Sequence, residues 1–320
     1  MSAAAAVLRG VVPAAPLLPP SSRGPATPED ALALDDAETA LLEEVAAQFE
    51  RLRVPDEEEE EAGIVNASGK RLCSPASEES IVRVLRTMGK RYPKDRARQA
   101  AAIAETLVAT IAWRRHVGAD TTLLAQSLPH AEAYHKGWPT RILGATDCFG
   151  RMIVYESVAA IDVDYLQQIT SDEVALLHAQ LLECLAIERR RRAIGLPHRI
   201  YSHIHVVDLA GFVLLDAMRS HVLSSCAAIF GVSKQHYSGA IKRLYITNVP
   251  MAFSAMWSVI SPWLPHDTRA KIRMVRGSGA AELVEEEGVD ASLLPSWIAE
   301  TGRDDGTLLA DILREKQQAL

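Results

Sequence analysis

The stretch that decides the fold is residues 243–277, RLYITNVPMAFSAMWSVISPWLPHDTRAKIRMVRG. Residues 245–247 predict a short buried strand, and Pro250 ends it because proline has no N–H with which to extend a central strand. Apolar side chains then recur at helical spacing; they are Phe253, Met256, Trp257, Ile260 and Leu264. A second short strand is expected over 272–275, so the stretch predicts strand, apolar helix, strand.

The predicted helix is unusually apolar, and its surroundings are basic. Met251, Val259 and Trp263 lie off the main apolar stripe. Residues 242–277 hold six basic side chains and one acidic side chain, Asp267. An apolar helix framed by cationic strand ends is typical of contact with an amphiphile or with a membrane surface.

The order of these motifs resembles the CRAL-TRIO family, the Sec-fourteen-like lipid-transfer proteins. The matching residues are Asn248, Pro250, the apolar gate helix 253–260, the break at 262–264, and Thr268 followed by Lys271 and Ile272. Residues 207–211 and the pair Asp147 and Gly150 extend the resemblance upstream. The resemblance implies an α/β fold: a mixed, mainly parallel sheet flanked by helices, with an apolar lipid pocket, preceded by a small helical domain. It covers roughly residues 78 to 302.

The chain is expected to divide into five parts. They are a disordered low-complexity tail (1–35), an amphipathic helix with an acidic linker (36–77), a helical domain (78–135), the lipid-binding domain (136–302) and a C-terminal tail (303–320). Residues 1–25 are poor in acids, so an organelle transit peptide is the alternative to a plain tail.

Charge is distributed unevenly along the 320 residues. Residues 27–61 carry 14 acids and 2 bases, whereas residues 141–277 carry 15 bases and 11 acids. A mildly basic body suits an anionic lipid, and without a basic stripe interleaved with aromatics we expect no nucleic-acid partner. The acidic run 56–61 is either a solvated linker or a surface for a protein partner.

The composition also indicates where in the cell the protein is expected to be. No apolar run reaches the 18 residues that a transmembrane helix needs. The four cysteines are widely spaced and form no C-x-x-C, which favours reduced thiols. We therefore expect a cytoplasmic protein that visits membranes transiently.

The predicted strand 201–208 alternates in an informative way. Tyr201, His203, His205 and Val207 point to one side, so two histidines share a face. They either line the ligand pocket or are hydrogen-bonded core residues. A metal site with His198 would lack a carboxylate or thiolate at useful spacing, and we expect no metal.

Catalytic patterns are missing from the sequence. It contains no G-x-S-x-G nucleophile elbow and no glycine-rich phosphate loop. We therefore expect a binding protein without cofactors, not an enzyme.

Two residues are candidates for the lipid headgroup. Thr268 and Lys271 are one turn apart and can face one anionic group, or they are a helix cap and a solvated lysine. The resemblance implies that they bind an inositol phosphate. However, Gly239 and Ala240 stand where phosphatidylinositol-binding members carry Glu-Arg, and Met88 stands where they carry an arginine. We expect transfer of a phospholipid such as phosphatidylinositol; the alternatives are an adaptor for small GTPases or other proteins, and a carrier of a tocopherol- or retinoid-like ligand.

Overall fold

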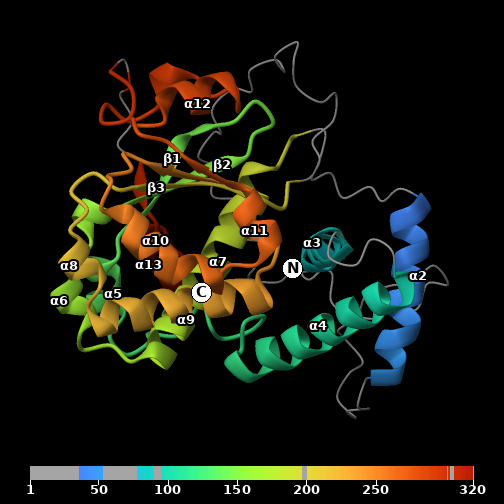
Figure 1. Ribbon diagram of the computed structural model, residues 1–320. Coiled ribbons are helices and arrows are strands. Elements are labelled where there is room, and N and C mark those ends of the chain that lie inside the picture. The colour runs from blue at the N-terminus through green and yellow to red at the C-terminus, as the bar shows by residue number, and fades with distance from the viewer. Residues whose placement is uncertain are drawn as a thin grey trace.

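The computed structural model describes residues 36–52, 78–89, 95–196, 200–300, 302 and 306–319. Several sequence expectations lie outside these ranges: the tail 1–35 with its transit-peptide alternative, the acidic run 56–61 and His198. The remainder folds as a helical part beside a sheet covered by helices on both faces (Figure 1). No helix in the described ranges is long and apolar enough to cross a membrane.

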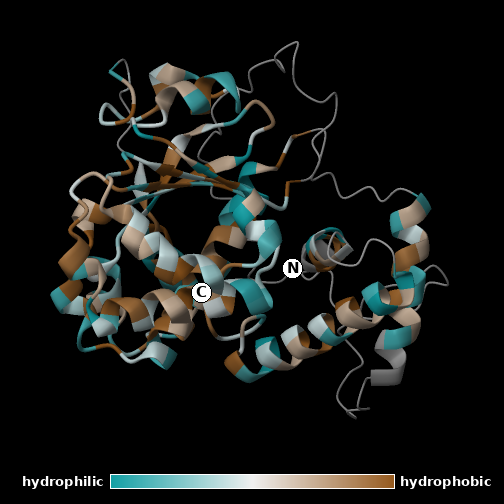
Figure 2. Ribbon diagram, in the orientation of Figure 1, coloured by the Kyte–Doolittle hydropathy of each residue, from teal (hydrophilic) through white to brown (hydrophobic). Residues whose placement is uncertain are grey.

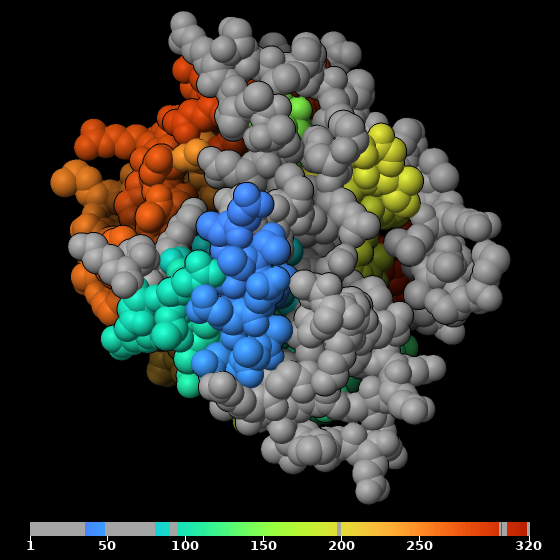
Figure 3. All heavy atoms as spheres, turned by 90° about the vertical axis from the view of Figure 1, so that its right-hand side faces the viewer, coloured from blue at the N-terminus to red at the C-terminus, as the bar shows by residue number. Residues whose placement is uncertain are grey.

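The helical part consists of α2 (Asp36–Leu52), α3 (Glu78–Gly89) and α4 (Arg96–Val117). Their apolar stripes meet in one cluster, to which Val45, Leu85 and Ile103 each contribute a buried side chain. Asp95 caps α4 by accepting a hydrogen bond from the backbone N–H of Arg98 at 3.0 Å. Figure 3 shows α2 lying across the outside of this part, with α4 beside it.

A single six-stranded sheet forms the body, in the order β5-β4-β3-β2-β1-β6. The strands are β1 (Thr140–Thr146), β2 (Met152–Ser157), β3 (His203–Asp208), β4 (Ile241–Thr247), β5 (Ile272–Met274) and β6 (Thr307–Leu308). Strands β2 to β5 pair in parallel, whereas β1 pairs antiparallel with both β2 and β6. The expected mixed, mainly parallel sheet is confirmed.

The helices of the body are mostly short. They are α5 (Ala131–Gly137), α6 (Val163–Leu166), α7 (Ser171–Arg192), α8 (Leu214–Ala217), α9 (Ser220–His236), α10 (Phe253–Ile260), α11 (His266–Ala270), α12 (Ala280–Glu285) and α13 (Leu309–Ala319). Three 3-10 turns occupy Val158–Ala160, Ser261–Trp263 and Ala291–Leu293. Helices α7, α9, α10 and α13 lie on one side of the sheet and α12 on the other (Figure 1).

The long helix α7 shows how its sequence sets where a helix begins and ends. Thr170 forms a capping box with Glu173, which satisfies donors at the positive end of the helix. In the last turn, Arg191 and Arg192 both donate to the buried carboxylate of Glu188, at 2.5 and 2.9 Å. The arginine run therefore completes the helix end, as its polarity predicts.

Three elements differ from the sequence expectations. The strand expected over 201–208 begins only at His203. The sequence also predicts one helix over 214–230, but the segment forms two helices because Arg219 is extended (ψ 140°) between α8 and α9. Strand β1 was not expected; it contains Gly144 and its register shifts between Ile142 and Thr146. The C-terminal segment contributes β6 and α13, which buries Leu309 and Leu313 in the main core.

The two faces of the sheet are covered by different segments. Ile204 and Val206 point to a face covered by the segment 280–299, where Leu283 and Leu294 are fully buried. The opposite face packs on α7 and α9 near β1 and β2, and on α10 near β3 and β4. Figure 2 marks apolar residues in brown, and they occur both on the strands and in bands along the helices around the sheet. His203, His205 and Val207 lie on the second face, which we call the gate face.

Candidate functional site

Helix α10 covers the gate face next to the carboxyl ends of β3 and β4. Phe253, Met256 and Ile260 are buried against Leu209, Val222, Cys226 and Ile246. Phe212 meets the ring of Phe253 edge-on, with centroids 5.6 Å apart, and Trp257 stacks obliquely on the same ring at 6.2 Å. The helix predicted to be the gate therefore lies closed on an apolar cluster.

A polar brace fixes the turn that leads into α10. The carboxylate of Asp208 accepts hydrogen bonds from the Tyr155 hydroxyl at 2.7 Å, the Asn248 amide at 2.7 Å and the backbone N–H of Ala210 at 2.9 Å. Asn248 itself has a φ of +50°, a left-handed conformation that asparagine tolerates better than most residues. Asp208 is thus the turn residue that its sequence context indicates.

The outer side of the gate carries small side chains and an apolar tip. The exposed positions Ser254, Ala255 and Ser258 place little bulk on this face of α10. At the start of the gate, Met251 is 94% exposed, and on the neighbouring α8 Leu215 is 83% exposed. Two large apolar side chains almost fully in water at one end of the molecule are a feature of surfaces that meet another apolar phase.

Beneath the gate face lies a buried carboxylate with an imidazole neighbour. Glu156 of β2 accepts a hydrogen bond from the Thr140 hydroxyl at 2.9 Å, and the Nε2 atom of His205 lies 3.5 Å from its other oxygen. Burial favours the neutral acid, but the charge of His205 and hydrogen bonds, including one from Trp138, outweigh it and lower the pKa of Glu156 to about 2. The carboxylate therefore stays ionised inside the protein.

A second histidine joins this group from α7. The Nδ1 atom of His178 lies 3.3 Å from the Tyr134 hydroxyl and its Nε2 atom 3.2 Å from the Ser233 hydroxyl. Burial lowers the pKa of His178 to about 4, so the ring is neutral at pH 7. We call Glu156, His178 and His205 the ligand cluster.

The four residues expected to line the pocket do not all lie at one site. His203 and His205 share the gate face, with ring centroids 5.7 Å apart, and Val207 packs in the cluster under α10. Tyr201 lies before β3 and faces the helical part, where its hydroxyl accepts a hydrogen bond from Arg86 at 2.8 Å. His205 is thus part of the ligand cluster, whereas Tyr201 belongs to a contact between the two parts of the chain.

Thr268 and Lys271 lie at the amino edge of β5. The Lys271 ammonium donates to the carbonyl of Ile241 at 2.9 Å, and its backbone N–H donates to the carbonyl of Thr268 at 3.0 Å. The ammonium is half-buried beside the start of β4, so it already holds the strand ends together. The role of both residues at a headgroup stays a prediction.

At Gly239, where the resemblance leads one to expect a glutamate, the structure leaves little room for a side chain. Gly239 has a φ of +77°, and a Cβ added there would lie 2.7 Å from the Thr87 hydroxyl and 3.2 Å from the carbonyl of Arg83. A glutamate would therefore be strained and would collide with α3. Met88 is buried in the core of the helical part.

Three residues that sequence reasoning did not single out stand out in the structure. Glu156 and His178 form most of the ligand cluster; a lone carboxylate in the otherwise apolar strand 152–157 was the available signal. Glu38 of α2 forms a two-point ion pair with Arg86, with N–O distances of 2.6 and 3.0 Å. The acidic N-terminal helix is thereby tied to the arginine that binds Tyr201.

Two other kinds of site were sought among the described residues. No group of three or more His, Cys, Asp or Glu side chains there is arranged to hold a metal ion. Cys148, Cys184 and Cys226 are free thiols, and burial raises the pKa of both Cys184 and Cys226 to about 12. In this part of the chain, the cysteines are neither metal ligands nor activated nucleophiles.

Known proteins share these features. The CRAL/TRIO domain family matches residues 136–296. The Sec14 cytosolic factor of Schizosaccharomyces pombe is 28% identical over 189 residues, which span 58% of this chain and 63% of that protein. The SEC14 cytosolic factor of Candida glabrata is 25% identical over 209 residues, covering 62% of this chain and 67% of that protein.

A solved structure agrees at the level of the fold. The crystal structure of Sfh5 superposes with a TM-score of 0.52 and 14% sequence identity, over 89% of this chain and 99% of that one. At this identity the likeness concerns the fold alone. The family match over half of the sequence, with the gate helix and sheet in the expected order, shows that the chain belongs to the CRAL/TRIO domain family, among its Sec14-like members.

Proposed function

We propose that the protein binds one lipid molecule between the gate face of its sheet and the helices α7, α9 and α10, and carries it between membranes. The observation that supports this most is the ligand cluster. An ionised carboxylate and two imidazoles on the helix-covered gate side of the sheet are costly in a core that serves stability alone, and they suit a pocket that receives a polar group.

The affinity would come from the acyl chains. Each buried methylene contributes about 0.8 kcal/mol, so one long chain outweighs any single hydrogen bond in the site. No chemical step is needed for this function. The exposed Met251 and Leu215 are placed to enter a bilayer when α10 opens, which supports a transient membrane contact.

The lipid of this proposal is a phospholipid, with Lys271 and Thr268 at its phosphate. One glutamate and two arginines of the phosphatidylinositol-binding members are replaced here by Gly239, Ala240 and Met88, which argues for loose selection among anionic phospholipids, with phosphatidylinositol accepted and only modestly preferred. A protein partner for the acidic segment 27–61 stays a separate proposal, which the Sec14-like relatives do not address.

Transfer of a fluorescent phospholipid between vesicles tests the function. Replacing both Phe253 and Trp257 with Asp should abolish transfer, because the closed gate cannot bury two carboxylates. The matched control is Ser254→Asp with Ser258→Asp, which adds the same charges to the exposed side of α10 and should retain most of the rate on neutral vesicles. Circular dichroism should show that both variants are folded. Normal transfer by the Phe253/Trp257 variant would contradict the assignment of the gate.

A further inference from the structure

The two ends of the helical part are joined to the lipid-binding domain in different ways. Within the described residues, the apolar cluster of the helical part is formed by α2, α3 and α4 alone. At the carboxyl end of α4, Trp113 and Val117 instead pack against the main core of the body. At the other end, polar groups make the contact between α3 and the chain just before β3.

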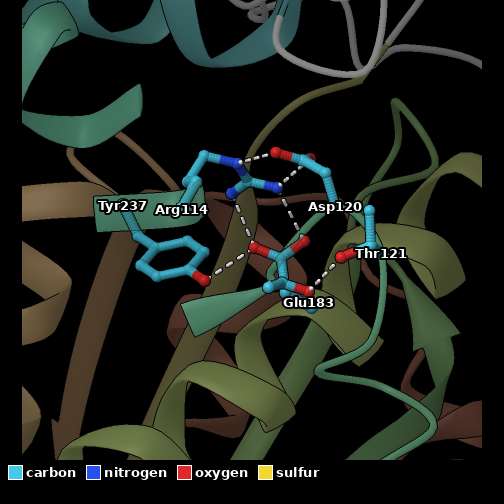
Figure 4. A network of polar contacts seen from close by, with 6 residues as sticks. Arg114, Asp120, Thr121, Glu183 and Tyr237 are labelled. Atoms are coloured by element: carbon cyan, nitrogen blue, oxygen red, sulfur yellow. Dashed lines mark hydrogen bonds and ion pairs between the residues drawn. The ribbon is translucent and has the colours of Figure 1, made fainter. Parts of the chain in front are cut away.

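A buried network holds the carboxyl end of α4 to the body (Figure 4). Arg114 donates to the carboxylate of Glu183 on α7 at 2.7 and 3.2 Å, and the Tyr237 hydroxyl donates to the same carboxylate at 2.6 Å. Arg114 also binds Asp120. The side chains of Arg114 and Glu183 are only 9% and 8% exposed, so dissolved salt screens this ion pair little. We call the contact of Arg114 with Glu183 and Tyr237 the α4 joint.

The contact made by α3 is more open to solvent. Arg86 donates to the Tyr201 hydroxyl at 2.8 Å, and its guanidinium lies 5.8 Å from the centre of the tyrosine ring. Glu38 of α2 orients this guanidinium through its two-point ion pair. The side chains of Arg86 and Glu38 are 19% and 24% exposed, so salt weakens this pair more than the α4 joint. We call the contact of Glu38, Arg86 and Tyr201 the latch.

The latch holds the chain at the point where it enters β3. Residues 200–202 are buried, but the pairing of β3 with β4 begins only at His203. Arg83 of α3 adds a hydrogen bond to the carbonyl of Tyr201, at 3.4 Å. The placement of α3 is therefore passed on to the amino end of the strand that carries His205 of the ligand cluster.

The packing between the two parts is interrupted between the latch and the α4 joint. A cavity of about 20 Å³ lies there, lined by Arg83 of α3, Arg114 of α4 and His203 of β3, among others. Side chains that line a void lose the dispersion contacts that a filled interface would give them. The closed arrangement of the two parts therefore depends strongly on the polar contacts beside the cavity.

We propose that the latch is a releasable contact that controls the exchange of lipid: when it opens, the helical part turns about the α4 joint and frees the amino end of β3. An anionic bilayer would open it, because lipid phosphates compete with Glu38 for Arg86 and because α2, with five acids and one base, is repelled by such a surface. The effect on lipid rests on the proposed function, whereas the latch itself can be tested without lipid.

Hydrogen exchange of the full chain without added lipid, measured by mass spectrometry, tests the latch. In Glu38→Gln, the amides of residues 200–204 should exchange about two- to fivefold faster than in the wild type, the factor expected for the loss of a partly exposed ion pair. Glu44→Gln is the matched control, since Glu44 also lies on α2 but pairs with Arg96 inside the helical part. This variant should leave the exchange of residues 200–204 unchanged.

Salt and a charge exchange separate the ion pair from local packing. Raising the ionic strength from about 0.05 M to about 0.5 M should speed the exchange of residues 200–204 in the wild type but not in Glu38→Gln. Arg86→Glu places two carboxylates side by side and should speed it further. Adding Glu38→Arg to that variant restores an ion pair, and a glutamate at position 86 can accept a hydrogen bond from the Tyr201 hydroxyl, so most of the protection should return.

Release of a bound fluorescent phospholipid to acceptor vesicles tests the link to lipid exchange. With neutral vesicles at low ionic strength, Glu38→Gln should release the lipid about two- to fivefold faster than the wild type, and Glu44→Gln at the wild-type rate. Vesicles that contain an anionic phospholipid should remove the difference between Glu38→Gln and the wild type, because they open the latch in both proteins.

Three results would count against the inference. Unchanged hydrogen exchange of residues 200–204 in Glu38→Gln, or an equal change in Glu44→Gln, would show that the latch does not hold β3. Faster hydrogen exchange with an unchanged rate of lipid release would overturn the link to lipid. A protein that binds no lipid would end the proposed function together with that link, while the hydrogen-exchange result would still decide whether the latch exists.

Discussion

The two faces of the sheet differ although adjacent residues of the same strands build them. On the face under segment 280–299, Ile204 and Val206 meet Leu283 and Leu294 in an apolar contact without accessible surface. On the gate face, their neighbours are His203 and His205, and the Nε2 atom of His205 lies 3.5 Å from the carboxylate of Glu156. One face is organised for stability, whereas the other keeps ionisable groups that a purely structural core would replace with apolar side chains.

This difference predicts opposite responses to mutation at neighbouring positions of β3. Ile204→Ala should destabilise the protein by about 2–5 kcal/mol, since it opens a cavity in a packed core, and should leave lipid selectivity unchanged. His205→Ala should cost less stability and alter lipid selectivity. Urea denaturation measures the stability of the two variants, and binding of a panel of lipids measures their selectivity. Equal loss of stability in the two variants, with unchanged selectivity in each, would mean that the faces are equivalent.

The second prediction concerns the loss of stability at acidic pH that the buried ionisable groups of the gate face should cause. The pKa of His178 is about 4 in the folded protein and 6.5 when exposed, so between these values the unfolded chain binds more protons. Stability should therefore fall as the pH drops from 6.5 to 4, by up to about 3 kcal/mol from this residue. Glu156, with a pKa of about 2, adds a loss in the same direction below pH 4.5.

His178→Gln isolates this effect, because glutamine can still bind the Tyr134 and Ser233 hydroxyls but does not titrate. The variant should show a flatter dependence of the unfolding free energy on pH. His266→Gln, in the exposed part of α11, is the control and should keep the wild-type slope. If His178→Gln retained the full slope, the acid sensitivity would arise elsewhere.

The smallest expected effect separates the two roles open to Lys271. Lys271→Ala should lower the affinity for anionic phospholipids about tenfold to a hundredfold, because it removes a charge-assisted hydrogen bond worth roughly 1.5–3 kcal/mol. The affinity for an uncharged sterol should not change. Competition with fluorescent lipids gives the ratio. Equal weakening for charged and uncharged lipids would show that the ammonium serves the β4 and β5 strand ends through the carbonyl of Ile241.

Much of the fold was predictable because its signals are local. Pro250 and the spacing from Phe253 to Ile260 define the gate helix, and the acids and bases at the two ends of α7 define its boundaries. Strand β1 was missed because Gly144 and the irregular register interrupt its alternation. The two-residue β6 has no pattern of its own; pairing with β1 makes it a strand.

The site was less predictable because its members are distant in sequence. The alternation in β3 places two histidines on one face, but it cannot say that Glu156 lies 3.5 Å from His205. His178 reaches them from α7, and only the packing of that helix on the sheet brings it there. Likewise, no local pattern pairs Glu38 with Arg86, which are 48 residues apart.

Mass spectrometry of an organic extract of the purified full-length protein tests the central claim most directly. If the gate face holds a lipid, protein taken from cells under native conditions should yield close to one lipid per chain, and the Phe253/Trp257 double aspartate variant should yield far less. A folded wild-type protein that carries no lipid, and takes up none from mixed phospholipid and sterol vesicles, would contradict the account.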